Sequence, residues 1–417
     1  MSWVTVLVLA MMVASDYKLR RRTPGESLSG RADLTVIAEV VVYGLVLAFL
    51  VLQVRRPPRL QRTSMLLTAT FAFGVALAAS AFYAVYPTTA LVRGMQLLVT
   101  CGLAYAIAQT AGRGHLHRLV HAYIALVTVS VLFGAVFPFP RTSLQANRFN
   151  WLHVHAVMAA TYLGLSVVLL IGLLLRNRNR WPYEGWPDRV YLAMLVLHVV
   201  ALLATRTRGG LAGCVAGSFV VAIASVRRKS RLDVAVLTVL AVGLATLIAS
   251  EDILSFLARG ESSESLRTLS ARTELWEEAF RLFWERPLFG YGLTASRGLF
   301  FETVGLGGAH NALVNVMVDA GVVGVVVFVA ILWTLVRSAR SLRGVNPVGD
   351  DIPIVLGVFT FLIVNSFTAE YMATPANTAN IWLFVLVGWV GVLHRLARER
   401  RGPSNDGVPG APKQLRR

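Results

Sequence analysis

Apolar runs of about 20 residues recur along this 417-residue chain, and they restrict its fold more than any other feature. A bilayer core takes roughly 20 apolar residues per helix. Because lipid offers the backbone no hydrogen-bond partners, such runs must be helices, and a membrane β-barrel would show short alternating segments instead. Hydrophobic residues make up 56% of the chain, and the mean hydropathy is +0.62. The sequence therefore predicts an all-α, polytopic integral membrane protein.

We expect about twelve transmembrane segments. They are 1–15, 34–54, 65–85, 91–110, 116–137, 151–175, 189–204, 209–226, 232–250, 311–336, 352–369 and 378–394. The first run is short and lacks a basic leading region, which favours a short or tilted span over a signal peptide. The chain is thus divided into helices at 1–250, one large extracytoplasmic loop at 251–310, helices at 311–394 and a basic tail at 395–417, which we expect to be disordered.

Lysine and arginine are unevenly divided between alternate loops. The loops at 55–64, 111–118, 176–189, 227–231, 337–351 and 394–417 hold 24 of the 40, so these loops and both termini are predicted to be cytoplasmic. The net charge of +18 comes from short loops between apolar runs, which favours contact with membrane lipids and not with nucleic acid. The basic loop at 16–33 falls on the outer side against this rule, and its role stays open.

The loop at 251–310 is the one long polar connection, and it holds six arginines and no lysine. Arginine binds phosphate oxygens with a planar fork, which suggests an anionic partner. Its segment 271–284 predicts an amphipathic helix along the membrane surface, capped by Ser270 and ended by Pro287. The apolar face is expected to hold Leu275, Trp276, Ala279, Phe280, Leu282 and Phe283. Arg272 lies in the first turn, where the helix dipole disfavours an ordinary cation.

His310 directly precedes the tenth span, in which Asn311, Asn315 and Asp319 recur at every fourth residue. This spacing forms one polar stripe on an apolar helix, and polar groups at membrane depth usually face a cavity or a partner helix. We expect the stripe to line a site. Near a helix N-terminus the dipole disfavours the imidazolium, so His310 is suited to accept a proton as a general base, although a capping or interfacial histidine is the ordinary alternative.

Arg206 and Arg208 open the eighth span on the same predicted face. A helix N-terminus favours anions, although a pair of boundary anchors would explain the two arginines equally well. The predicted topology brings Arg208, Arg272 and His310 together on the outer side. No nucleotide loop, nucleophile elbow or zinc-ligand spacing appears, so neither a cofactor nor a metal is expected.

Five short motifs occur in a characteristic order. They are Arg208-Gly-Gly, Ser270-Ala-Arg-Thr-Glu-Leu-Trp276, Glu285-Arg-Pro-Leu-Phe-Gly-Tyr-Gly292, Ala309-His-Asn311 and Asp319-Ala-Gly-Val-Val-Gly324. Together they resemble the O-antigen ligase and O-antigen polymerase superfamily of bacterial membrane glycosyltransferases. The likeness extends over about 192–336 by motif, and over the whole chain by the number of spans and the single large loop.

The resemblance implies transfer of a glycan from an undecaprenyl diphosphate carrier to a glycan, lipid or protein acceptor, outside the bacterial cytoplasmic membrane and without a metal. By resemblance, Arg208 and Arg272 would hold the diphosphate and His310 would activate the acceptor hydroxyl. Arg206 could share the role of Arg208. We also expect Asn311, Asn315, Asp319 and Trp276 to bind substrate. The main alternative is a transporter or flippase for a lipid-linked sugar, and a receptor or structural membrane protein is a third.

Overall fold

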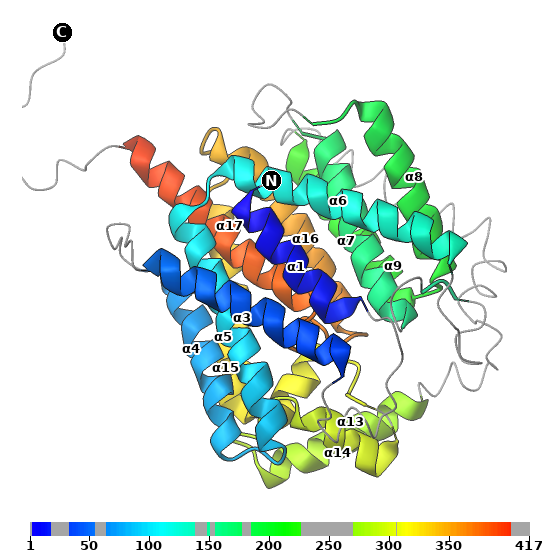
Figure 1. Ribbon diagram of the computed structural model, residues 1–417, viewed down its shortest axis with the longest axis vertical. Coiled ribbons are helices and arrows are strands. Elements are labelled where there is room, and N and C mark those ends of the chain that lie inside the picture. Colours follow the sequence, from blue (N-terminus) through cyan, green and yellow to red (C-terminus); the bar gives the residue numbers. More distant parts are fainter. Residues whose placement is uncertain are drawn as a thin grey trace, which may run out of the picture.

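The computed structural model describes residues 2–17, 33–54, 64–137, 148–150, 155–176, 185–226, 270–305 and 307–401, without the side chains of 54, 270–273 and 401. Within these residues the protein is all-helical, as predicted (Figure 1). The α-helices are α1 (Trp3–Asp16), α3 (Leu34–Val54), α4 (Met65–Ala79), α5 (Pro87–Thr110), α6 (Arg113–Val136), α7 (Ala156–Leu174), α8 (Asp188–Ala204), α9 (Arg208–Ser225), α13 (Ser270–Glu285), α14 (Ala295–Val304), α15 (Ala312–Ser341), α16 (Ile352–Ser366) and α17 (Thr378–Arg401). Two short 3-10 helices are η1 (Ser80–Phe82) and η5 (Val348–Asp351).

Nine of the described helical segments are long and apolar enough to cross a membrane, which makes this a polytopic membrane protein. Two further predicted segments form shorter helices, the apolar α1 with 14 residues and α8 with 17 residues. The predicted segment 232–250 lies outside the described residues. The tail was predicted to be disordered from residue 395, and this is wrong for its first part, because α17 continues as a helix to Arg401. Arg395 holds this extension by donating to the carbonyl oxygen of Ala108 at 3.1 Å.

The connections between the helices gather at two ends of the bundle, in the alternation that the charge pattern predicted. At one end, which we call the Asp351 end, the buried Asp351 carboxylate joins η5 to α6 and α17. It accepts from Arg113 Nε at 3.2 Å and from Trp389 Nε1 at 3.0 Å, and His117 Nε2 lies 3.2 Å away. Nearby, the Tyr191 hydroxyl at the start of α8 lies 2.6 Å from His121 Nε2. The connections α5 to α6, α7 to α8 and α15 to α16 therefore share one end.

The opposite end, which we call the His310 end, collects the other set of connections. The Asp16 carboxylate at the end of α1 accepts from the backbone N–H of Thr378 at the start of α17, at 2.7 Å. The Tyr83 hydroxyl, just after α4, donates to the carbonyl oxygen of Phe289 at 3.0 Å. In Figure 1, α13 and α14 lie across this end, below α4, α5 and α15.

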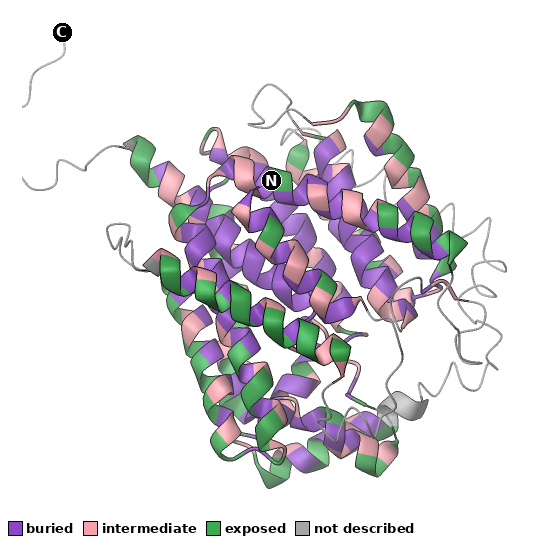
Figure 2. Ribbon diagram, viewed as in Figure 1, coloured by how far each residue is buried: buried purple, intermediate pink, exposed green. Residues whose placement is uncertain are grey.

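Helices α5, α7, α16 and α17 form the most buried part of the bundle, whereas α3 lies at the edge with exposed apolar side chains (Figure 2). Trp382 and Trp389 of α17 are fully buried. Helices α9 and α16 approach closely where Gly217 faces Gly357, because a Cβ at Gly217 would lie 2.7 Å from the Gly357 carbonyl oxygen. In lipid the hydrophobic effect does not drive helices together, so their association depends on close van der Waals packing, which small residues permit.

Helix α15 is interrupted at Gly321, which has φ 61° and ψ −161°. The chain at 287–292 supplies the hydrogen bonds that the break removes. Val322 N and Val323 N donate to the carbonyl oxygens of Pro287 at 2.8 Å and Leu288 at 3.2 Å. In return, the carbonyl oxygens of Val318 and Asp319 accept from Tyr291 N at 3.0 Å and Gly292 N at 2.9 Å. We call this pairing of 287–292 with 318–323 the α15 joint.

The joint attaches a small separate core to the bundle. Helices α13 and α14 pack with the first nine residues of α15, 312–320, and we call these three pieces the cap. Its buried apolar residues are Leu275, Ala279, Leu282, Tyr291, Ala295, Phe300, Ala309 and Val318. The Tyr86 hydroxyl donates to Glu302 Oε1 at 2.5 Å and ties the cap to the start of α5. Burial, helped by this bond, raises the pKa of Tyr86 to about 12.

Removing the buried carboxylate at the Asp351 end is expected to destabilise the bundle strongly. Asp351→Ala leaves the Arg113 guanidinium buried without its partner, which should lower the free energy of unfolding by about 3–5 kcal/mol. The measurement is unfolding in mixed micelles. The matched control is Glu399→Ala, which breaks a loose pair with Arg395 in which the Glu399 side chain is 49% exposed, and it should cost less than about 1 kcal/mol. Equal losses for the two variants would contradict this role for Asp351.

Gly321→Ala is expected to disrupt the α15 joint. The left-handed φ costs a non-glycine residue about 1–2 kcal/mol, and here a Cβ would also collide with the backbone of Leu288. Gly344→Ala is the control, because Gly344 has φ 83° but open space around it. We predict a larger fall in thermal stability for Gly321→Ala, with faster amide hydrogen exchange at Val322 and Val323. If the two variants behave alike, the joint does not hold the cap.

Candidate functional site

His310 lies at the N-terminus of α15, as predicted, in a half-buried position within a tight loop. Its φ is 50°, a left-handed conformation that histidine adopts more readily than most residues. The His310 N–H donates to Glu370 Oε2 at 3.3 Å. The Glu370 carboxylate also lies directly against Gly308, where a Cβ would collide with it. Glu370 thus holds the loop in front of His310.

The polar stripe Asn311, Asn315 and Asp319 is buried on one face of α15, and its oxygens accept from backbone amides. Asn311 caps the helix by accepting from Leu313 N at 2.9 Å, and Asn315 Oδ1 accepts from Ala309 N at 2.9 Å. Asp319 accepts from Thr294 N at 2.9 Å and Ser296 N at 2.7 Å, at the start of α14. These contacts position the loop and the cap, and substrate binding by the stripe stays a prediction.

Helix α13 confirms the predicted amphipathic segment. Leu275, Ala279 and Leu282 are buried inside the cap, whereas Phe280 is 51% exposed. Trp276 Nε1 donates to the Ala309 carbonyl oxygen at 3.2 Å, next to His310.

Arg272 lies in the first turn of α13, one turn before Trp276. Its side chain lies outside the described residues. The backbone alone therefore brings the Arg272 position to the His310 end, and its contact with a phosphate stays a prediction.

Arg208 is the first residue of α9, as expected, with Thr207 as its N-cap residue, and both Arg206 and Arg208 are half-buried at the His310 end. The start of α9 packs closely on its neighbours. A Cβ at Gly209 would collide with the Thr368 side chain at the end of α16, and a Cβ at Gly210 would lie 2.7 Å from Ala160 of α7. Glycine at both positions allows this approach.

The segment after α16 connects the two predicted halves of the site. Thr368 lies against the start of α9, and Glu370, only two residues later, lies against the loop of His310. Arg208 and His310, about a hundred residues apart in sequence, are therefore joined through a few residues of one connection. This is the same face that the topology predicted for Arg208, Arg272 and His310.

Sequence reasoning gave no role to three further residues at this end. Glu370 contacts the His310 loop at Gly308 and His310. Arg297 of α14 is exposed, and its side chain lies beside Gly307, 3.6 Å from where a Cβ would be. Arg148 donates to Thr205 and Thr207 before α9. None of these residues lies in a recognisable motif, so the sequence carried no local signal for them.

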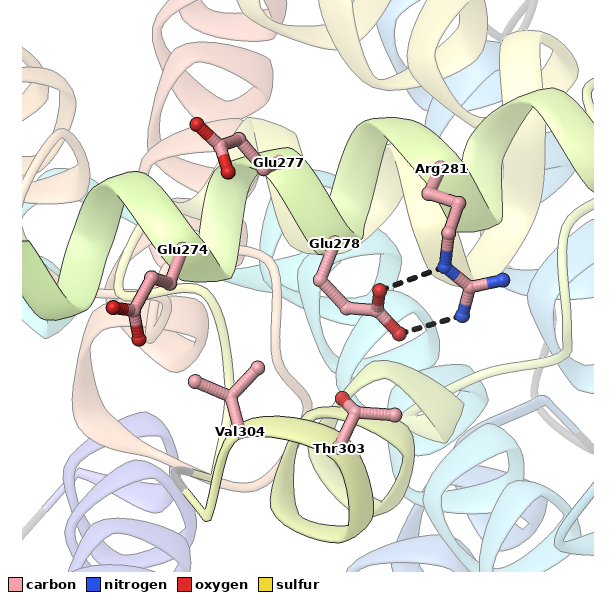
Figure 3. Close-up of a pocket in the computed structure, with 6 residues that line it drawn as sticks. All are labelled: Glu274, Glu277, Glu278, Arg281, Thr303 and Val304. Carbon is pink, nitrogen blue, oxygen red and sulfur yellow. Dashed lines mark hydrogen bonds and ion pairs between the residues drawn. The ribbon is translucent and has the colours of Figure 1, made fainter.

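A cavity of about 480 Å³ lies between α13 and α14 on another side of the cap. Figure 3 shows Glu274, Glu277, Glu278 and Arg281 of α13 around it, with Thr303 and Val304 of α14. Arg281 donates to both carboxylate oxygens of Glu278, and this holds the Glu278 pKa below its usual range. Neither Trp276 nor His310 lines this cavity.

The His310 end thus offers a histidine at a helix N-terminus and arginines at the start of a second helix. Guanidinium groups and free helix amides stabilise phosphate charge. A neutral imidazole can take a proton from a hydroxyl. This chemistry fits a reaction in which a hydroxyl attacks and a phosphate group leaves.

Two comparisons with known proteins bear on this site. Residues 192–329 match the model of the family described as O-Antigen ligase. A protein of Haemophilus influenzae described as uncharacterized is 23% identical over 307 residues, which covers 68% of this chain and 70% of that protein. The family match includes the start of α9, the whole of α13 and α14, and His310 at the start of α15. The similarity to the O-antigen ligase family therefore covers the part of this membrane protein that holds Arg208 and His310.

Proposed function

We propose that this protein is a glycosyltransferase that moves a glycan from an undecaprenyl diphosphate carrier to an acceptor hydroxyl. The observation that carries this proposal is the placement of the start of α9, with Arg208, and the loop of His310 against the same short connection after α16, at one end of a membrane bundle. Both helix starts lie in the region matched to the O-antigen ligase family. The acceptor is a glycan in a polymerase, and a lipid or protein in a ligase.

In the proposed reaction, the acceptor hydroxyl oxygen bonds to the anomeric carbon of the glycan. The bond from that carbon to the diphosphate oxygen breaks, and undecaprenyl diphosphate leaves with the electron pair. His310 takes the hydroxyl proton as general base. Arg208 and Arg272 bind the diphosphate and stabilise its growing negative charge, with Arg206 as a second cation at the same turn. These groups supply the needed chemistry without a metal or cofactor.

The carrier's lipid tail requires a site at the membrane surface, and the His310 end of the bundle meets this requirement. We propose twelve spans, the nine long helices together with α1, α8 and 232–250. The basic loops at the Asp351 end favour a cytoplasmic location for that end, so the His310 end faces outward from the bacterial cytoplasmic membrane. The partners would be the lipid-linked donor, the acceptor and membrane lipids.

Within the described helices, the break in α15 is a feature that a transporter would share, because transporters use interrupted helices to bind substrate in mid-membrane. In this protein the four backbone groups next to the break are bonded to 287–292. They are not available to a substrate. The break also lies only nine residues from the start of the helix, close to the His310 end. We therefore favour transfer over transport.

Loss of the proposed base should abolish transfer while the carrier still binds. We expect His310→Ala and His310→Asn to lower the turnover number by about 10²–10⁴, the usual contribution of a general base. Asparagine tolerates the left-handed backbone at this position, so it separates lost chemistry from backbone strain. The assay is release of undecaprenyl diphosphate from a lipid-linked oligosaccharide by protein in lipid, with carrier binding measured in parallel.

His394→Ala serves as the matched control, because His394 contacts the Ser338 carbonyl oxygen at the opposite end. This variant should keep its turnover. Normal turnover in His310→Asn would remove His310 as the base. If the wild type instead carries labelled lipid-linked sugar across the vesicle membrane without releasing carrier, the transporter alternative replaces the present proposal.

Trp276→Phe should slow transfer without unfolding the cap. Phenylalanine keeps an aromatic ring but removes the N–H that donates to Ala309, and one such bond contributes about 0.5–1.5 kcal/mol. We expect a roughly 3- to 10-fold fall in turnover number because the loop of His310 loosens. Trp333→Phe, at a 66% exposed position on α15, is the control and should have no effect. Equal activity of the two variants would contradict the role of the indole.

A further inference from the structure

Arg148 fastens the turn between α8 and α9. Its Nε donates to the Thr205 carbonyl oxygen at 3.0 Å, and a terminal nitrogen donates to Thr207 Oγ1 at 2.9 Å. The next residue adds a third bond, from Phe149 N to the Ala204 carbonyl oxygen at 2.9 Å. The short segment 148–150 thus runs along the turn that leads into Arg208.

This turn has a conformation that needs support. Arg206 has φ 49°, a left-handed backbone that costs an arginine about 1–2 kcal/mol. Such conformations persist where the surroundings hold them, and they cluster at functional positions. Thr207 is only 3% exposed, and its hydroxyl lies 3.4 Å from the Ala156 carbonyl oxygen of α7 as well. Arg148 therefore fixes the residues on both sides of Arg206.

Arg148 also lies close enough to Tyr371 to influence its pKa electrostatically. Burial raises the pKa of Tyr371 above its usual range, the negative charge of Glu370 raises it further, and Arg297 and Arg148 lower it. Arg148 is thus within electrostatic range of the residue that follows Glu370. The same short connection contacts the loop of His310.

We propose that Arg148 is a positioning residue that locks the Arg206–Arg208 turn, so that Arg208 meets the carrier diphosphate in a fixed orientation. This inference rests on the proposed transferase function. An arginine suits this role because its planar fork satisfies two acceptors at once, whereas a lysine offers a single point of charge. Fixed donors stabilise a charged leaving group better than mobile ones, since no reorganisation is needed during the reaction.

The first test is the pair of variants Arg148→Lys and Thr207→Val, each made with and without Arg208→Ala. Lysine keeps the charge of Arg148 but not its fork, and valine removes only the accepting hydroxyl. We expect each to lower kcat/KM for the lipid-linked donor on the order of tenfold, as for a lost hydrogen bond to a charged group. In the Arg208→Ala background neither should cause a further loss. Thr207→Ser should restore activity.

The second measurement is hydrogen exchange of the amides at 207–211 in the full-length protein in lipid. Arg148→Lys should speed their exchange while the thermal unfolding temperature stays within a few degrees of wild type. Arg176→Lys is the matched control, because Arg176 donates to the Leu173 carbonyl oxygen at the opposite end. It should change neither the exchange at 207–211 nor the donor kcat/KM.

The outcomes separate this inference from the proposed function. A further loss for Arg148→Lys in the Arg208→Ala background would mean direct contact with substrate and would overturn a positioning role. Unchanged amide hydrogen exchange at 207–211 in Arg148→Lys would mean that Arg148 does not hold the turn before α9. A wild-type protein that neither binds nor releases the carrier would refute the transferase proposal, whereas the exchange measurement would still decide whether Arg148 holds the turn.

Discussion

The interruption of α15 at Gly321 is the constraint on which the rest of the His310 end depends. A helix that breaks at membrane depth exposes amides and carbonyls that lipid cannot satisfy. In this protein the backbone of 287–292 satisfies them, so that segment cannot move without leaving polar groups unpaired. Because 287–292 joins α13 to α14, the break fixes the position of both helices. The cap and the bundle are thereby made one unit.

The joint gives a physical reason for two of the motifs that carry the family resemblance. Gly290, Gly292 and Gly321 all have positive φ, and at each a Cβ would collide with facing backbone. Asp319 holds the first amides of α14 from the opposite side. The motifs at 285–292 and 319–324 are therefore the two halves of one contact. This contact holds α15, whose N-cap residue Asn311 follows His310.

The sequence predicts the bundle well because its signals are long and local. Apolar runs indicate the spans, alternation of basic loops indicates the two ends, and helical spacing of Leu275 and Ala279 indicates α13. The sequence predicts the α15 joint poorly. The segments 287–292 and 318–323 are some thirty residues apart, and they pair through backbone groups that every residue carries. Spacing also shows that Asn315 and Asp319 share a face, but not that backbone amides cover it. Arg148 and Glu370 lack any motif, so only the folded chain gives them a role.

The central claim is that one carrier diphosphate binds at the His310 end, between the starts of α9 and α15. The most direct test is an experimental structure of the full-length protein in lipid nanodiscs with an undecaprenyl diphosphate-linked oligosaccharide. We predict that the diphosphate contacts the Arg208 guanidinium and that the first sugar lies next to His310. A diphosphate bound at the Asp351 end, or in mid-membrane away from both residues, would contradict this account.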